Sequence, residues 1–148
     1  MSGMCSSIGA CVTVALSLLV AGCSSFSREW KAATPPAQDA LGIEGRWIGT
    51  WQNTNNTHAD RMRAVVREVA PLEYRVYFHA KYKKILGFKY HATFLGSAQN
   101  GAFVFHGEQD LGKLAGGLYR YDGSIRPTNF FSTYQSKYDS GTFTLGRE

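Results

Sequence analysis

The sequence predicts a mainly β protein: a single antiparallel up-and-down meander of about eight strands, closed or nearly closed into a barrel. Apolar and polar residues alternate with period two from residue 45 to the end, which is the pattern of half-buried strands. Short turn segments such as Asn100-Gly101 separate the alternating runs, as in hairpins. Each run has one apolar face and one charged face, so closing the sheet is the simplest way to hide its two edges.

The alternation places each strand. In the run 74–83, one face carries Tyr74, Val76, Phe78, Ala80 and Tyr82, and the other is mostly basic. The run 88–97 repeats this pattern, and Asn100-Gly101 then leads into the run 102–109. The expected strands are 45–52, 61–70, 74–83, 88–97, 102–109, 117–122, 128–136 and 141–147.

The inward faces are rich in aromatic residues. In so small a barrel these rings are expected to fill the interior as a packed core, and a ligand cavity is the alternative. The inward set is Trp51, Phe78, Tyr82, Phe88, Tyr90, Phe94, Phe103 and Phe105.

Gly45-Arg46-Trp47 resembles the Gly-x-Trp opening of the calycins, the small barrels that include lipocalins and avidin-like proteins. The resemblance implies that Trp47 closes one end of the barrel and that a basic residue of the last strand, here Arg147, lies across it. Tyr-x-Tyr-x-Gly at 119–123 and a related pattern at 134–143 are instead similar to MORN hairpin arrays. That resemblance implies an open sheet.

Residues 1–22 are predicted to be a signal peptide. They contain no charge, and their apolar core of roughly 14 residues is shorter than the ~20 that a transmembrane helix needs. Val20-Ala21-Gly22-Cys23 resembles the bacterial lipobox, which implies that Cys23 is acylated and becomes the first residue of the mature chain. The usual Lys or Arg at the start of a signal peptide is missing, so an ordinary secreted protein or a buried helix remains the alternative.

Residues 23–44 are expected to be a lipidated N-terminus and flexible tether before a barrel domain at 45–148. The serine after Cys23 implies an outer-membrane lipoprotein facing the periplasm. The other two cysteines lie in the leader, which excludes a disulfide scaffold or cysteine metal site in the mature domain.

The chain carries a formal net charge of +5, and its basic residues cluster on the predicted strands two to four. We expect this outer face to bind an anionic envelope polysaccharide or lipid headgroups, with a merely solvated surface as the alternative. Nucleic acid is not an expected partner. The predicted anionic-partner residues are Arg61, Arg63, Arg67, Arg75, Lys81, Lys83 and Lys89.

No catalytic motif is recognisable in the sequence, and no cofactor is expected. If Tyr82 pairs with Phe88, His79 lies opposite His91, while His106 lies opposite Leu95; no carboxylate clearly completes a metal site. The predicted function is therefore a non-catalytic binding or scaffolding lipoprotein with a basic outer face. A lipocalin-type barrel for a small apolar ligand is the main alternative, and an envelope hydrolase is a lesser one.

Overall fold

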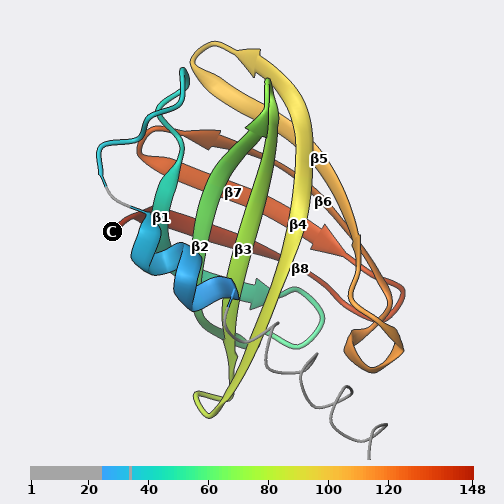
Figure 1. Cartoon of the computed structure of the whole chain (residues 1–148). Coiled ribbons are helices and arrows are strands. Elements are labelled where there is room, and N and C mark those ends of the chain that lie inside the picture. Colours follow the sequence, from blue (N-terminus) through green and yellow to red (C-terminus); the bar gives the residue numbers. More distant parts are fainter. Residues whose placement is uncertain (1–24, 34) are drawn as a thin grey trace, which may run out of the picture.

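A computed structural model describes residues 25–33 and 35–148 of the chain. Its eight strands follow one another around a closed antiparallel barrel, because β1 pairs with both β2 and β8 (Figure 1). The predicted meander is confirmed, and the open MORN-like sheet is wrong. The strands are β1 (Gly45–Asn53), β2 (Ala59–Ala70), β3 (Glu73–Tyr82), β4 (Leu86–Gln99), β5 (Ala102–Asp110), β6 (Leu118–Arg126), β7 (Asn129–Gln135) and β8 (Ser140–Arg147).

The β3–β4 hairpin is tighter than the sequence suggested. Lys83 and Lys84 both have positive φ, and the Ile85 amide donates a hydrogen bond to the Tyr82 carbonyl at 3.3 Å. Tyr82 therefore pairs with Leu86 rather than with Phe88. The two-residue shift in register keeps every side chain on its predicted face but changes its cross-strand neighbours.

One half of the barrel is a closely packed aromatic core. Trp47 and Phe78 are fully buried there, and the rings of Phe94 and Phe105 stack with centroids 4.1 Å apart. Phe130 meets Trp47 edge to face at 5.8 Å. These contacts follow from the period-two alternation, which sends the apolar side chains of all eight strands to one interior.

The core half is closed by the segment that precedes β1. Ile43 is fully buried, and its carbonyl accepts a hydrogen bond from Trp47 Nε1 at 3.1 Å. The Asp39 carboxylate accepts hydrogen bonds from the Ile43 amide and from the Tyr74 hydroxyl, which ties the segment to β3. The Arg147 guanidinium lies 4.3 Å from the centroid of the Trp47 ring, in the position that the calycin resemblance implies.

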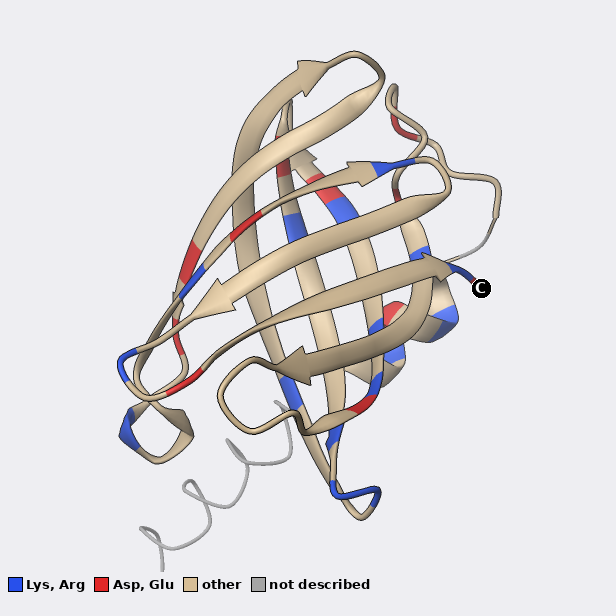
Figure 2. Ribbon diagram, turned by 180° about the vertical axis from the view of Figure 1, so that it is seen from behind, with Lys and Arg blue, Asp and Glu red and all other residues tan. Residues whose placement is uncertain are grey.

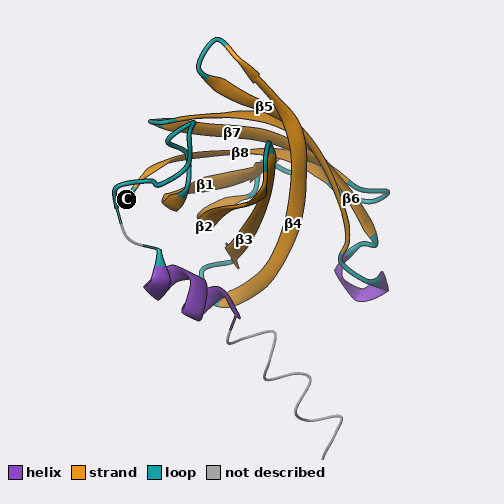
Figure 3. Ribbon diagram, turned by 45° about the horizontal axis from the view of Figure 1, so that its top comes forward, coloured by secondary structure: helices purple, strands orange, loops and turns teal. Residues whose placement is uncertain are grey.

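The described part of the segment expected to be a flexible tether is largely structured. Residues 25–32 form a helix that lies on the outside of the barrel against β2 and β3 (Figure 3). Phe26 is only 3% exposed, and the Arg63 guanidinium lies 4.9 Å from the Trp30 ring. Sequence reasoning missed this helix because two turns are too short to show a clear helical period, and the apolar residues find their partners only on the folded barrel.

The predicted leader and Cys23 lie outside the described residues. Within the described ranges, no helix is both long and apolar enough to cross a membrane.

Candidate functional site

The half of the barrel opposite Trp47 holds a pocket of about 550 Å³. Its lining comes from the end of β1, the start of β2, the β3–β4 hairpin, the β5–β6 connection and the β7–β8 turn, all of which meet at this open end of the barrel. Small residues shape it: Ala80, an inward position of β3, lines the pocket, and Gly141 of β8 makes room for the Tyr134 side chain, because a Cβ there would lie 2.4 Å from the Tyr134 hydroxyl.

One wall of the pocket is a cluster of three rings, two of them parallel and the third tilted against both. Trp51 and Tyr82 are nearly parallel, with centroids 6.4 Å apart, and the His58 ring lies 4.8 Å from that of Tyr82. Trp51 Nε1 donates a hydrogen bond to the Lys81 carbonyl at 2.8 Å, which fixes the orientation of the indole. This wall offers flat π surfaces.

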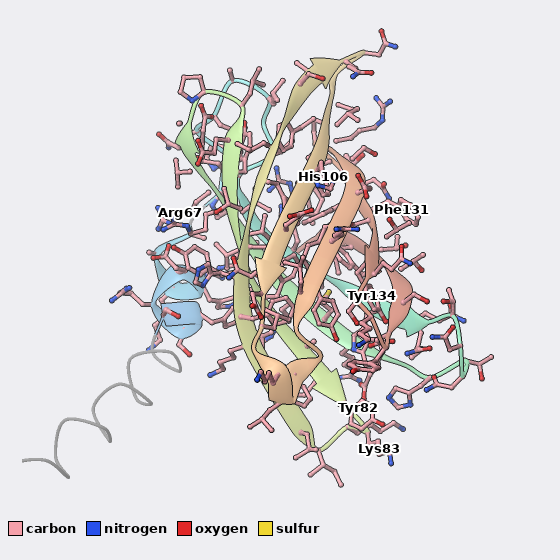
Figure 4. All side chains as sticks on the ribbon, turned by 90° about the vertical axis from the view of Figure 1, so that its right-hand side faces the viewer. Arg67, Tyr82, Lys83, His106, Phe131 and Tyr134 are labelled. Atoms are coloured by element: carbon pink, nitrogen blue, oxygen red, sulfur yellow. The ribbon has the colours of Figure 1, made fainter. Side chains whose placement is uncertain are left out.

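The facing wall is formed by tyrosines. Tyr90 and Tyr121 share a hydroxyl–hydroxyl hydrogen bond, and the Tyr119 ring lies 6.4 Å from Tyr121 and 6.3 Å from Tyr134. Burial raises the pKa of all four phenols, so each is a neutral hydroxyl at physiological pH. Figure 4 shows Tyr134 and Tyr82 in the same half of the barrel, with Lys83 beyond them.

The pocket also contains a few polar groups. The Asp139 carboxylate accepts a hydrogen bond from the Asn53 amide, and burial raises its pKa. Among the described residues, His58 Nε2 and the Tyr134 hydroxyl are buried without a hydrogen-bond partner. Since an unpaired buried polar group costs about 1–3 kcal/mol, these two atoms are natural contact points for a polar group of a ligand.

The barrel therefore contains both a packed aromatic core and a cavity, the two alternatives that the sequence left open. The predicted inward aromatic set divides between them: Phe78, Phe94, Phe103 and Phe105 are core, whereas Trp51, Tyr82, Phe88 and Tyr90 line the pocket. Phe88 lies at the rim and is 50% exposed. The preference for a filled core was thus right for one half of the barrel and wrong for the other.

Sequence reasoning did not single out His58, Leu114 or Tyr138 as parts of a site. They come from loops that are far apart in the chain and that lack strand periodicity. The only signal for these residues was a general one: binding residues often lie on loops held by a rigid scaffold.

The N-terminal helix occupies part of the predicted basic face. It covers the centre of this face: Arg63 lies 5.5 Å from the Phe26 ring, and Arg67 donates to the Glu29 carboxylate. Of the remaining predicted residues, Lys81 is half-buried. The others are exposed: Arg61, Arg75, Lys83 and Lys89. Figure 2 shows blue basic segments toward the hairpin tip as well as under the helix.

The three strand histidines do not converge. His79 lies opposite Lys89 and His91 opposite Tyr77, so the predicted pairing of His79 with His91 is wrong because of the tighter hairpin. His106 lies opposite Leu95 as predicted, and its Nδ1 is 2.9 Å from the Asp122 carboxylate. Within the described residues, no three side chains gather as a metal site.

Fold and pocket together define a small closed up-and-down β-barrel with one plugged end and one open end. No protein-family model matches the chain, and no curated protein matches it. Among solved structures, a de novo designed fluorescence-activating β-barrel is similar, with a TM-score of 0.55 and 13% sequence identity over 78% of this chain and 100% of the designed one. At that identity the likeness concerns the fold.

Proposed function

We propose that this protein is a non-catalytic binding barrel, held at the cell envelope by an acylated Cys23. Its ligand is a small, flat and largely apolar molecule with a hydrogen-bonding group. The observation that carries the proposal is the aromatic pocket with two unpartnered polar atoms at its wall. A volume of about 550 Å³ and an apolar lining with few polar groups are typical of small-molecule sites.

The chemistry of the walls supports this ligand class. Trp51 and Tyr82 present parallel ring faces that stack on a planar molecule. The Tyr134 hydroxyl and His58 Nε2 supply one hydrogen bond each, as donor or acceptor according to hydroxyl rotation and imidazole tautomer. The pocket replaces the basic outer face as the leading candidate, because the helix covers the centre of that face.

Titration with a panel of fluorogenic planar dyes tests the pocket. Tyr134→Phe removes a buried hydroxyl that has no hydrogen-bond partner, so it should raise the free energy of unfolding by about 1–3 kcal/mol. It should weaken a dye that hydrogen-bonds there by about 2–10-fold. Tyr77→Phe, on the outside of β3, is the matched control and should change neither quantity.

A second variant and the salt dependence separate the pocket from the basic face. Ala80→Phe places a ring in the pocket and should abolish dye binding. Pocket binding should hardly change with ionic strength, whereas binding through exposed lysines and arginines weakens once the Debye length falls to ~10 Å at 0.1 M salt. Dye binding that survives Ala80→Phe and disappears with salt would refute the pocket proposal.

The envelope part of the proposal rests on the lipobox resemblance. Cys23→Ala should abolish acylation and processing and release the protein from the membrane fraction. Persistent membrane association with unchanged cleavage would show that Cys23 carries no anchor. Since dye binding is measured separately, the two halves of the proposal can fail independently.

A further inference from the structure

The open end of the barrel carries apolar side chains that the core does not bury. Ile85, at the tip of the β3–β4 hairpin, is 84% exposed, and its neighbour Leu86 is 55% exposed. Leu114 is fully exposed on the short 3-10 turn η1 (Lys113–Ala115) of the β5–β6 connection. Ile85 and Leu86 are neighbours, and a group of exposed apolar side chains rimmed by polar residues marks a membrane or protein interaction site.

Lysines surround these apolar tips. At the open end, in the segments 53–60, 81–89, 110–118 and 135–140, the basic side chains are all lysine, and the acids are Asp60, Asp110 and Asp139. The lysines are Lys81, Lys83, Lys84, Lys89, Lys113 and Lys137. This end is therefore net positive and pairs an aliphatic tip with a basic collar (Figure 2).

The backbone of the β3–β4 turn indicates that Lys83 and Lys84 have a role other than stabilising the turn. Lys83 and Lys84 have φ of 51° and 62°, in the left-handed region that costs a non-glycine residue roughly 1–2 kcal/mol. The β4–β5 hairpin of the same chain meets the same requirement with Asn100 and Gly101, the residues that favour such a turn. Two positive charges thus occupy positions where the backbone favours Asn-Gly.

We propose that the open end of the barrel docks on an anionic lipid bilayer. Ile85, Leu86 and Leu114 enter the boundary between headgroups and acyl chains, and the lysine collar contacts the phosphates. Apolar side chains of peripheral proteins reach ~5–10 Å into this boundary, and each nearby lysine adds about 1 kcal/mol on an anionic leaflet. Separate projecting tips ringed by lysines fit a lipid surface better than a protein partner, which calls for a continuous complementary patch.

The placement of the N-terminal helix agrees with this orientation. Phe26, near its start, lies 5.3 Å from His79, on the open-end half of β3. Trp30 lies beside Arg46 at the start of β1, so the helix runs from the open half toward the plugged half. The described chain therefore begins, at Ser25, on the open half of the barrel. Docking does not depend on a ligand in the pocket, but it turns the pocket mouth toward the bilayer.

Tryptophan placed at the hairpin tip of the full chain tests the docking. Ile85→Trp is compared with Val69→Trp, an exposed apolar position at the β2–β3 turn of the plugged end. Both are mixed with phosphatidylcholine vesicles that contain brominated acyl chains, with or without an equal part of phosphatidylglycerol. The signal of the unsubstituted chain is subtracted, and any anchor at Cys23 is common to both variants.

With phosphatidylglycerol present, the tryptophan at position 85 should shift to the blue and lose about half of its fluorescence to the bromolipid, while that at position 69 should not change. Reversing two charges with Lys83→Glu and Lys84→Glu in the Ile85→Trp chain should remove most of the quenching, and so should high salt. Equal quenching at the two positions, or none at position 85 on the anionic vesicles, would overturn the proposal.

Discussion

Replacing Arg147 with alanine tests how the plugged end is held together. Besides stacking on Trp47, the guanidinium donates hydrogen bonds to three backbone carbonyls, those of Gly42, Glu44 and Pro127. One side chain of the last strand therefore fixes the segment before β1 and the β6–β7 turn together. Burial lowers the pKa of this guanidinium, which stays charged at physiological pH.

The expected cost follows from these contacts. Stacking of the half-buried Arg147 guanidinium on the fully buried Trp47 indole contributes about 1 kcal/mol. The two carbonyls before β1 are partly buried, and the loss of a charged donor from each costs about 1 kcal/mol. The bond to Pro127 is exposed, and water replaces it. Arg147→Ala should therefore lower the free energy of unfolding by about 3 kcal/mol.

Urea unfolding monitored by circular dichroism measures the difference, read from the midpoint at constant slope. Arg126→Ala is the matched control, because Arg126 lies at the same end and makes one exposed bond to the Asn100 carbonyl; it should cost less than about 0.5 kcal/mol. Arg147→Lys keeps the charge but not the planar fork, and should lie between the two. Equal effects of Arg147→Ala and Arg126→Ala would show that Arg147 is merely a solvated surface arginine.

Three further predictions concern the plug, the helix and its contact with β3. Trp47→Ala should lower the free energy of unfolding by about 3–5 kcal/mol in the same urea assay, because it removes a fully buried ring. A cost below about 1 kcal/mol would mean that Trp47 does not plug this end of the barrel. Phe26→Ala should release the helix, so that hydrogen exchange of residues 25–32 accelerates about 100-fold. The exposed control Ser27→Ala should leave the exchange unchanged. Slow exchange in both variants would refute the docking of the helix. Burial and the nearby Arg63, Lys81 and Lys89 lower the pKa of His79 from 6.5 to about 4. The unfolded chain then takes up the proton first, so stability should fall as the pH drops through this window, and His79→Gln should reduce that pH dependence; an identical pH profile in the variant would contradict it.

The alternation of side chains was sufficient to predict the barrel. The apolar face of 74–83 and the turn at Asn100-Gly101 are local properties of the chain, and a closed sheet is the arrangement that buries every such face at once. The contact between Arg147 and Trp47 was expected from the calycin resemblance, and the closed meander pairs the last strand with the Trp47 strand.

The pocket was decided by tertiary structure. Sequence alternation shows which residues point inward, but whether inward rings touch depends on side-chain volumes summed across eight strands. Ala80 leaves space that no local pattern reveals, and His58, Leu114 and Tyr138 reach the pocket from separate loops. The β3–β4 register was likewise out of reach, because the conformation of Lys83 and Lys84 is unfavourable by intrinsic preference.

The sequence by itself therefore determined the strands, their inward faces and the closed topology, because each of these follows from contacts between chain neighbours or from the need to bury one face. Only the folded structure decided that Phe26 and Trp30 lie against Arg63 of β2 and that the barrel is filled at one end and hollow at the other. Those features depend on side chains that are distant in the chain and on how closely their surfaces fit.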